Sequence, residues 1–445
     1  MAEAAPPRRS PPPVASVCAT AAAPWSPLLA VRGACRAGMH ERAALVGVNI
    51  FDALWCGSSA MASPCNHAHD VVHALRSLKE SGLTVFRFFA SLYGWRHVQW
   101  LREPARFWAS FDRLMDEVES QRLQVVVCIG AEQWHEVANV WANASESLND
   151  LVLDAGSLSR SLATRYATEV VSRYRQRPSV LFWELGNELN LESNMPPQRC
   201  SSSSTPSTRL GVQRQHEPLQ SGSSKPRSRR CFGTAALVEY TRALVDSIRH
   251  ADPIRPISSG FGIARPNAWH LERNPIRAHL EVDTREEWQR MVQWQHDAVD
   301  IVSIHVYGGK GGACWFGSKA GGGNACYRQS NLSVLSATAE AAAAVGKLLY
   351  IGEYGGAPPN FTGPSLAAQA FPEALLRWQE GEARAARESR VRTVSSIWSW
   401  TCAAKRASMY CIWPYQEQGK KVEEEGASAH MRERLVRVAR RVGQY

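Results

Sequence analysis

The sequence predicts an α/β protein built as a single (β/α)8 TIM barrel, and three observations lead to this fold class. Eight short apolar segments rich in β-branched residues recur along the 445 residues, most of them starting roughly 40–55 residues after the one before. The segments are continuously apolar rather than alternating, which is typical of parallel strands buried on both faces. Segments with helical periodicity lie between them, and eight such units favour a closed barrel over an open sheet. No Gly-x-Gly-x-x-Gly sequence opens the first helix, which counts against a dinucleotide-binding fold.

The predicted strands lie, in chain order, at Ala44–Ile50, Thr84–Phe89, Gln124–Ile129, Val180–Leu185, Ile254–Ser259, Ile301–Tyr307, Leu348–Gly352 and Val394–Trp400. Predicted helices between them include Phe107–Gln121, Ser159–Arg175, Ala235–His250, Leu335–Val345 and Ala367–Ala386. The fourth interval is longer because about residues 193–232 form a basic, Ser/Arg-rich insertion with almost no apolar content, which we expect to be disordered or loosely held. We therefore predict one barrel domain over residues 42–445, after a targeting or disordered segment over residues 1–41.

Composition narrows the class of function. The chain is 44% hydrophobic and 21% charged, as globular proteins are. No apolar run reaches the roughly 18 residues that a membrane span needs. The net charge of +10 comes from scattered arginines, without a basic stripe or a zinc-finger spacing, so we expect no nucleic-acid partner. Sixteen tryptophans exceed what a soluble core usually needs and are typical of clefts that bind sugars on flat aromatic faces.

Cysteine spacing favours an oxidising compartment. Four close pairs bracket segments that resemble loops: Cys56 with Cys65, Cys200 with Cys231, Cys314 with Cys326, and Cys402 with Cys411. Disulfides across such loops, together with glycosylation triplets at Asn143, Asn331 and Asn360, predict a secreted protein. Cys128 lies in an apolar run and is expected to be an ordinary core residue. An organelle-targeted protein is the alternative for localisation, and free buried thiols in a reducing compartment are the alternative for the cysteines.

Polar residues at the ends of the predicted strands form the candidate site. The active site of such a barrel lies at the carboxyl ends of its strands. The residues found there are Arg87 after strand 2, Asn187 and Glu188 after strand 4, His305 and Tyr307 after strand 6, Glu353 after strand 7, and Trp398 and Trp400 after strand 8. Because strands 4 and 7 are three positions apart in a ring of eight, Glu188 and Glu353 are expected to face each other across the mouth.

Two facing carboxylates are the groups that hydrolyse a glycosidic bond. One carboxyl must stay protonated near neutral pH to donate to the departing oxygen, and the other must be ionised to attack the anomeric carbon. We expect the two groups to lie about 5–5.5 Å apart, the spacing of a retaining enzyme, rather than the 6.5–9.5 Å that admits water and inverts the centre. No metal or organic cofactor is required. Salt-bridged residues without catalytic function are the structural alternative.

These residues resemble glycoside hydrolase family 5 of clan A. The segments Gly82–Ala90, Phe182–Glu188 and Ile304–Tyr307 are similar in order and content to those of eukaryotic endo-β-1,4-mannanases, over about residues 42–443. The resemblance implies a retaining glycoside hydrolase that cleaves a β-linked polysaccharide or oligosaccharide, a mannan in the first instance, and acts as a monomer.

The same resemblance implies a role for each site residue. Glu188 would be the acid/base and Glu353 the nucleophile, while Asn187 would bond the 2-hydroxyl of the sugar. Arg87 and Tyr307 would bond Glu353, and His305 would lie beside the two carboxylates. Either Trp398 or Trp400 would form the floor of the subsite, and Glu184 would lie beneath the site.

The chain also departs from the family pattern. The end of strand 3, Cys128–Trp134, lacks the histidine that many members place there, and the insertion after Glu188 is unlike the compact loop expected. Both departures bear on the substrate rather than on the reaction. The alternatives are a β-glucanase or cellulase, a transglycosylase of the same family, and a catalytically inactive carbohydrate-binding protein.

Overall fold

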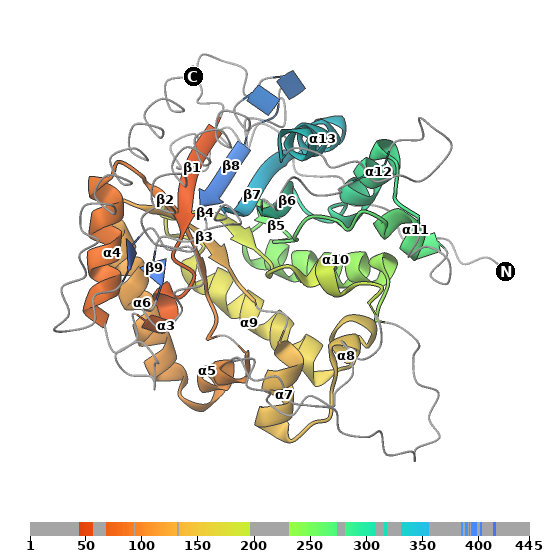
Figure 1. Cartoon of the computed structure of the whole chain (residues 1–445). Coiled ribbons are helices and arrows are strands. Elements are labelled where there is room, and N and C mark those ends of the chain that lie inside the picture. Colours follow the sequence, from red (N-terminus) through yellow and green to blue (C-terminus); the bar gives the residue numbers. More distant parts are fainter. Residues whose placement is uncertain are drawn as a thin grey trace, which may run out of the picture.

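Eight parallel strands close into a barrel in chain order, as the sequence predicts (Figure 1). The computed structural model describes residues 44–56, 68–92, 94–130, 133–195, 231–273, 281–307, 316–317, 331–355, 384–385, 388–389, 391, 393–397, 401–402 and 413–414. The strands are β1 (Ala44–Asn49), β2 (Val85–Phe89), β3 (Gln124–Cys128), β4 (Val180–Glu184), β5 (Ile257–Ser258), β6 (Ile301–Tyr307), β7 (Leu348–Gly355) and β8 (Thr393–Ile397). Pairing of β1 with β8, from Ala44 opposite Thr393 to Val48 opposite Ile397, closes the ring.

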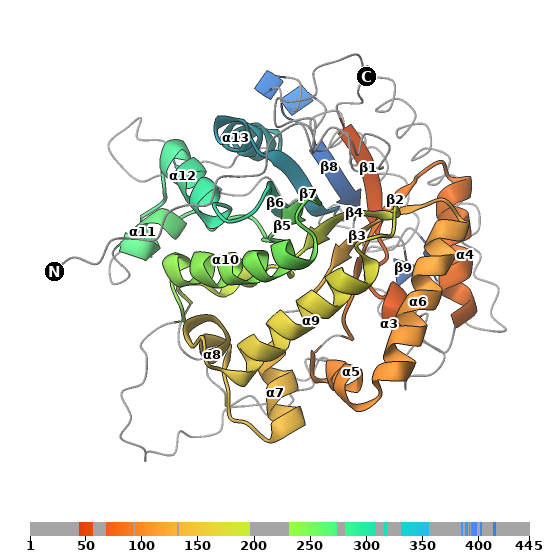
Figure 2. The same cartoon turned by 180° about the vertical axis from the view of Figure 1, so that it is seen from behind.

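Helices surround the barrel on its outside, and the two opposite views agree on this arrangement (Figures 1 and 2). The helices are α3 (Ala53–Cys56), α4 (Ala68–Glu80), α5 (Gln99–Arg102), α6 (Pro104–Ser120), α7 (Trp134–Ala142), α8 (Leu148–Leu153), α9 (Leu158–Tyr174), α10 (Thr234–Ala251), α11 (Ala268–Arg273), α12 (Arg285–Gln295) and α13 (Asn331–Ala344), with 3-10 turns η2 (Gly94–Val98) and η3 (Leu189–Glu192). Four of the predicted helices correspond to α6, α9, α10 and α13. The fifth, Ala367–Ala386, lies outside the described residues apart from 384–385.

Helix starts follow local sequence signals. Ser157 precedes α9, and its side chain accepts a hydrogen bond from the Arg160 backbone N–H. At α12, Thr284 and Glu287 form a reciprocal capping box, in which each side chain accepts from the other residue's backbone N–H. These bonds satisfy donors that a helix leaves unpaired in its first turn.

The strands are buried on both faces, which explains their continuous apolar sequences. Along β2, Phe88 points outward and meets Phe111 of α6 at a ring separation of 5.8 Å. Val85 lies in a second cluster of buried side chains contributed by the strands, which also contains Val126 and Phe182. Arg87 alternates with Phe88 along the strand, and its side chain is fully buried. A charged residue therefore occupies an interior position just beyond this apolar layer.

Two strands differ in length from the predictions. Strand β5 is limited to Ile257–Ser258 because Pro253 and Pro256, which lack a backbone N–H, interrupt the predicted Ile254–Ser259. Strand β7 extends to Gly355 and carries Glu353 within it rather than after it. A short parallel pair, β9 (Thr401–Cys402) with β10 (Trp413–Pro414), was not predicted.

The two ends of the predicted insertion lie side by side. The backbone N–H of Asn194 donates to the Phe232 carbonyl at 2.8 Å, and the N–H of Cys231 donates to the Met195 carbonyl at 2.9 Å. Cys231 is buried and disulfide-bonded, but its partner lies outside the described residues, so the pairing with Cys200 stays a prediction. Cys128 is buried and is not part of a disulfide. None of the described helices combines the length and the apolar character that crossing a membrane would require.

Candidate active site

Arg87 is the centre of a buried hydrogen-bond network at the carboxyl end of the strands. Its Nε donates to Glu184 Oε1 at 2.6 Å, and its Nη1 donates to Glu353 Oε1 at 2.7 Å. The Nη1 group also reaches Asn49 Oδ1 at 3.1 Å, and Nη2 donates to Asn187 Oδ1 at 2.8 Å. Burial lowers the pKa of the Arg87 guanidinium, but the charges of Glu184 and Glu353 outweigh burial and raise it well above its usual range. Arg87 therefore stays charged and orients residues at the ends of three strands, β1, β4 and β7.

Glu353 and His305 are brought side by side by an irregularity in the pairing of β6 with β7. Ile304 lies opposite Ile351, but His305 lies opposite Glu353, so that Gly352 is passed over in the register. A Cβ atom at Gly352 would lie 2.6 Å from His305 Nε2. Only glycine at this position lets the imidazole lie against β7 and reach the neighbouring carboxylate.

Glu188 occupies a strained turn after β4. Its backbone adopts φ +59° and ψ 20°, a left-handed conformation that is uncommon for a residue with a side chain. The Glu188 N–H donates to the Gly260 carbonyl at 2.8 Å, which ties this turn to the end of β5. Gly260 has φ +69°, and a Cβ there would lie 1.8 Å from the Gly186 carbonyl oxygen. Strain of this kind concentrates at functional sites, because the surrounding structure must hold it.

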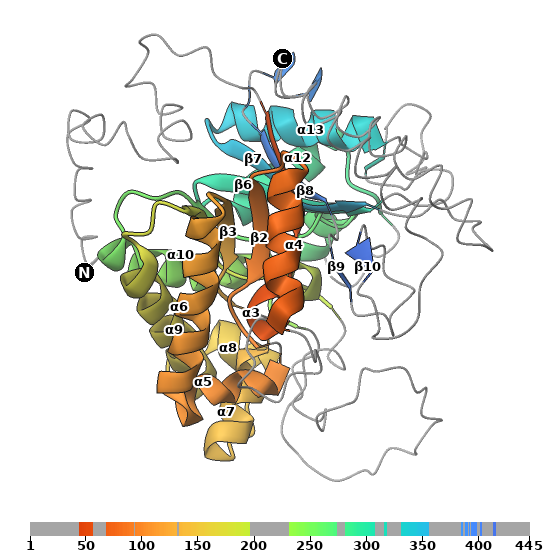
Figure 3. The same cartoon turned by 90° about the vertical axis from the view of Figure 1, so that its left-hand side faces the viewer.

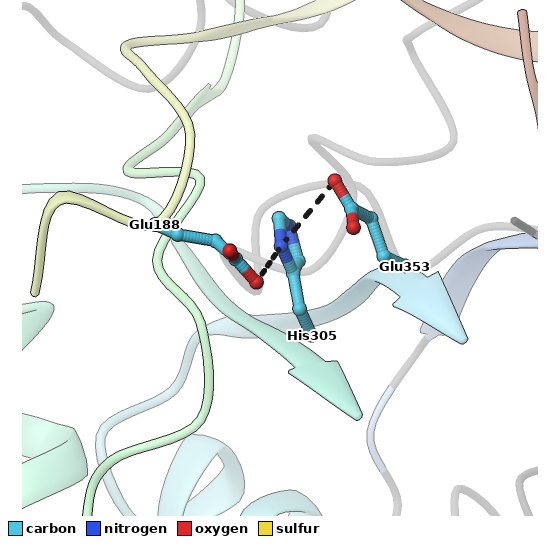
Figure 4. Close-up of side chains that lie close together, drawn as sticks. All are labelled: Glu188, His305 and Glu353. Carbon is cyan, nitrogen blue, oxygen red and sulfur yellow. Dashed lines mark hydrogen bonds and ion pairs between the residues drawn. The ribbon is translucent and has the colours of Figure 1, made fainter. Parts of the chain in front are cut away.

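His305 lies between the two candidate carboxylates (Figure 4). Its Nδ1 is 3.0 Å from Glu188 Oε1 and 3.5 Å from Glu353 Oε1. The nearest carboxylate oxygens and this nitrogen all lie within 4.8 Å of one another. His305 Nε2 is buried and has no hydrogen-bond partner among the residues that the structure describes. A buried N–H without an acceptor is costly, so the ring proton belongs on Nδ1, from which it is donated to Glu188.

Glu188 differs from the expectation that one carboxyl stays protonated near neutral pH. Burial raises the pKa of the Glu188 carboxyl. The hydrogen bond and electrostatic interaction with His305 and the charge of Arg87 lower it, and the net result is a pKa below the ordinary value. The Glu188 side chain remains 29% exposed, whereas that of Glu353 is 6% exposed. In the free protein, Glu188 is therefore held as a carboxylate by its neighbours.

Glu188, His305 and Glu353 are also the one described group of three side chains with the spacing of metal ligands. Imidazole and carboxylate suit zinc and similar ions. Here Glu353 Oε1 already accepts a charge-assisted bond from Arg87 at 2.7 Å, and His305 Nδ1 is directed at Glu188. A divalent cation would have to displace both bonds beside a buried guanidinium. The donor set suits a hydrogen-bonded pair of acids better than a metal centre.

Two residues of the network are absent from the sequence-based set. Asn49 at the end of β1 is buried, accepts from Arg87, and donates through Nδ2 to the Gly352 carbonyl at 2.9 Å. Cys128 at the end of β3 lies 3.7 Å from Arg87 Nη2. Both could have been found, because each is a polar or polarisable residue at the carboxyl end of an apolar strand.

Other predicted site residues have different outcomes. The side chain of Tyr307 and all of Trp398 and Trp400 lie outside the described residues. Trp134, just after strand β3, is only 5% exposed and packs against His97 at a ring separation of 5.1 Å. Its side chain therefore belongs to the core and not to a sugar-binding surface. Glu184 lies beneath the site as expected, fully buried against Arg87.

Solved structures that are similar to this chain over most of its length include glycoside hydrolases. The endo-1,4-β-mannanase of Rhizomucor miehei covers 92% of this chain and 97% of its own, at 12% identity and a TM-score of 0.54. A glycoside hydrolase family 5 mannosidase of the same organism covers 89% and 93%, at 11% identity and a TM-score of 0.54.

A family 1 β-glucosidase from Thermotoga maritima is also similar, over 91% of this chain and 99% of its own, at 11% identity and a TM-score of 0.55. No protein-family model matches the chain, and no curated protein matches it in sequence. At these identities the likeness establishes the fold. The barrel expected from the resemblance to glycoside hydrolase family 5 of clan A is confirmed.

Proposed function

We propose that this protein is a retaining glycoside hydrolase acting on a β-linked polysaccharide, with mannan as the substrate. One observation carries the proposal: a carboxylate oxygen of Glu188 and one of Glu353 lie within 4.8 Å of each other, and His305 lies between them. Retaining enzymes place their carboxyl groups about 5–5.5 Å apart, whereas inverting enzymes need about 6.5–9.5 Å. The close approach of the two carboxylates supports direct attack by Glu353 rather than attack by a water molecule held between Glu353 and the sugar.

In the first step, a Glu353 oxygen attacks the anomeric carbon while the bond from that carbon to the glycosidic oxygen breaks. The charge-assisted bond that Arg87 donates to Glu353 at 2.7 Å limits the orientation of this carboxylate. Glu188 protonates the departing oxygen, so that the leaving sugar departs as an alcohol. The product of this step is a glycosyl ester on Glu353.

Glu188 needs a proton for this step, and its surroundings indicate how it acquires one. A sugar ring over the mouth would cover the 29% of the Glu188 side chain that is exposed. Removal of water disfavours the charged form and raises the pKa of the Glu188 carboxyl, in opposition to His305. In the second step, Glu188 takes a proton from water, which attacks the anomeric carbon and releases Glu353.

The contact between Arg87 and Asn187 supports a binding role for Asn187. Because Arg87 Nη2 donates to Asn187 Oδ1 at 2.8 Å, the amide oxygen is engaged and the amide orientation is defined. The Nδ2 group is left as a donor of two hydrogen bonds, which suits a sugar hydroxyl. The 2-hydroxyl of the sugar attached to Glu353 is the group we assign to it.

The choice of mannan rests on the resemblance of the site segments to mannanases and on the substrates in the names of the similar structures. A secreted location rests on the four close cysteine pairs. A β-glucan substrate and transglycosylation use the same two carboxylates and are therefore outcomes of the same experiment.

A panel of purified β-mannan, β-glucan and xylan tests the proposal, with the Glu353→Gln variant as the blank. We expect new reducing ends from mannan with the wild-type protein alone. Proton NMR during the first minutes should show the β anomer as the first product. Turnover that yields the α anomer first would refute the retaining mechanism, and no turnover of any polymer would favour the carbohydrate-binding alternative.

A further inference from the structure

Two exposed tryptophans lie at the carboxyl end of the barrel, away from the catalytic network. Among the described residues, the large apolar side chains that are exposed are Trp95 (37%), Trp141 (45%), Leu153 (55%) and Val345 (41%). Trp95 belongs to η2, which follows β2, and Trp141 belongs to α7, which follows β3. Helices α3, α5, α7 and α8 lie together at one end of the molecule (Figure 3). Elements that follow strands directly occupy the end at which the site opens.

Trp95 is part of a rigid group with Trp55 and Arg96, which we name the rim cluster. The Arg96 guanidinium lies over the Trp95 ring at 5.1 Å and over the Trp55 ring at 5.7 Å. The Trp95 backbone N–H donates to Glu136 Oε2 at 3.2 Å, which attaches η2 to α7. The cluster therefore joins the elements that follow the first three strands.

Packed rings lead from Arg87 toward the segment that carries Trp55. The Arg87 guanidinium lies 5.0 Å from the centre of the Phe89 ring, and Phe89 meets Phe51 at 6.0 Å. Phe51 is four residues before Trp55, and α3 begins at Ala53 between them. The segment that carries Trp55 therefore starts beside the ring that Arg87 contacts.

Arg96 differs from the other arginines that stack on tryptophan near it in the fold. Arg165 lies 5.2 Å from the Trp100 ring but forms an ion pair with Glu169 at 2.7 Å. No carboxylate of the described residues pairs with Arg96, whose side chain is exposed. Stacking engages the flat face of a guanidinium and leaves its N–H donors, which lie in the plane, available for a planar anion. Carboxylates match that edge with two parallel hydrogen bonds.

We propose that Trp55, Trp95 and Arg96 form a sugar-binding subsite for a residue that carries a carboxylate, such as a uronic acid, in the polysaccharide substrate. The exposed part of Trp95 binds the sugar ring, and the N–H edge of Arg96, held over Trp95 and Trp55, binds the carboxylate. The net charge of +10 favours the approach of an acidic polymer. This inference deepens the proposed function and rests on it for the polysaccharide backbone.

Binding without turnover tests the subsite, in the full chain with Glu353→Gln as the background. The probes are β-mannan and the same β-mannan after partial carboxymethylation, and the measurement is affinity by calorimetry at low and at high salt. We expect tighter binding of the carboxymethylated polymer. Arg96→Gln should reduce that affinity by up to about 5-fold, the upper end of the range for one exposed ion pair, and should change the affinity for unmodified mannan less. High salt should remove most of the difference.

Arg165→Gln is the matched control. This substitution also removes one positive charge and one contact with a tryptophan ring. Arg165, however, already pairs with Glu169, so it is not expected to bind a carboxylate of the polymer. The proposal is overturned if Arg96→Gln weakens both polymers equally, if it changes neither, or if Arg165→Gln has the same effect. Failure of the proposed function would be separate: the wild-type protein would then hydrolyse neither polymer, whatever the two arginine variants do to binding.

Discussion

Replacing Arg87 with methionine is the perturbation for which the structure predicts both a stability effect and an activity effect. Arg87 is fully buried and pairs with Glu184 and Glu353, which are nearly or fully buried themselves. Methionine has an unbranched side chain of similar length but no charge, so the substitution leaves the carboxylates of Glu184 and Glu353 without their cation. Breaking a buried pair by removing one partner costs about 3–5 kcal/mol, because a buried charge remains uncompensated. That is a large share of the 5–15 kcal/mol that is typical of folded proteins.

Activity should fall independently of folding. Arg87→Met removes a charge-assisted bond to Glu353 and the bond that orients Asn187. A hydrogen bond to a charged group contributes about 1.5–3 kcal/mol. At about 1.4 kcal/mol for each factor of ten, loss of the Glu353 bond alone should lower kcat/KM by about 10- to 150-fold.

Arg255→Met is the matched control for this experiment. Arg255 is 2% exposed, pairs with Asp252, and donates to the Val180 carbonyl at 2.9 Å, at the start of β4 and thus at the opposite end of the barrel. Urea unfolding followed by tryptophan fluorescence should show both variants destabilised. Only the Arg87 variant should lose kcat/KM per folded molecule on the polysaccharide that the wild type cleaves. Equal activity in the two variants, or wild-type stability of Arg87→Met, would refute the reasoning.

Three further predictions follow from the site and the cysteines. Glu353→Gln should retain the wild-type circular dichroism spectrum but less than a few per cent of the activity, and substantial turnover by this variant would contradict the role of Glu353. Glu188→Ala should lose less activity on substrates with activated leaving groups, and azide should restore its activity. His305 lowers the pKa of the Glu188 carboxyl, so activity that needs protonated Glu188 is present at low pH and is lost as pH rises through that pKa. In His305→Ala, burial still raises the pKa of Glu188 while the opposing effect of His305 is lost, so the alkaline limb of kcat/KM against pH should move to higher pH. A limb that stays in place would argue against the contact between His305 and Glu188. Non-reducing peptide mapping should find Cys231 linked to Cys200, and any other partner would disprove that pairing.

The fold could be predicted because burial of a barrel strand on both faces makes its local sequence continuously apolar. Each strand is covered by helices on one side and by the barrel interior on the other, so its residues are apolar without alternation, as in Val125–Cys128. The boundary of β5 was predicted less well. Its neighbouring residues are apolar enough for a strand, but Pro253 and Pro256 cannot donate to the ladder.

The paired acids could also be predicted, because strand order in a closed barrel converts sequence position into angular position. Glu188 and Glu353 follow strands three apart, and the ring brings them face to face. The direction in which the pKa of Glu188 shifts could not be predicted in the same way. It depends on a contact of 3.0 Å with His305, and contacts of that kind are decided by side-chain orientation across 117 residues of sequence.

The sequence by itself determined the fold class, the end of the barrel at which the candidate site lies, and the two carboxylates placed there. Only the tertiary structure decided how those groups are held. Three features depend on register and on contacts between distant segments. Gly352 is passed over in the pairing of β6 with β7, which sets Glu353 beside His305. The Asn49 amide joins β1 to Arg87, and the Arg96 guanidinium lies over two tryptophan rings. Periodicity reports whether a residue is buried, because burial repeats along an element. It carries no information on which distant side chain a buried or exposed group meets.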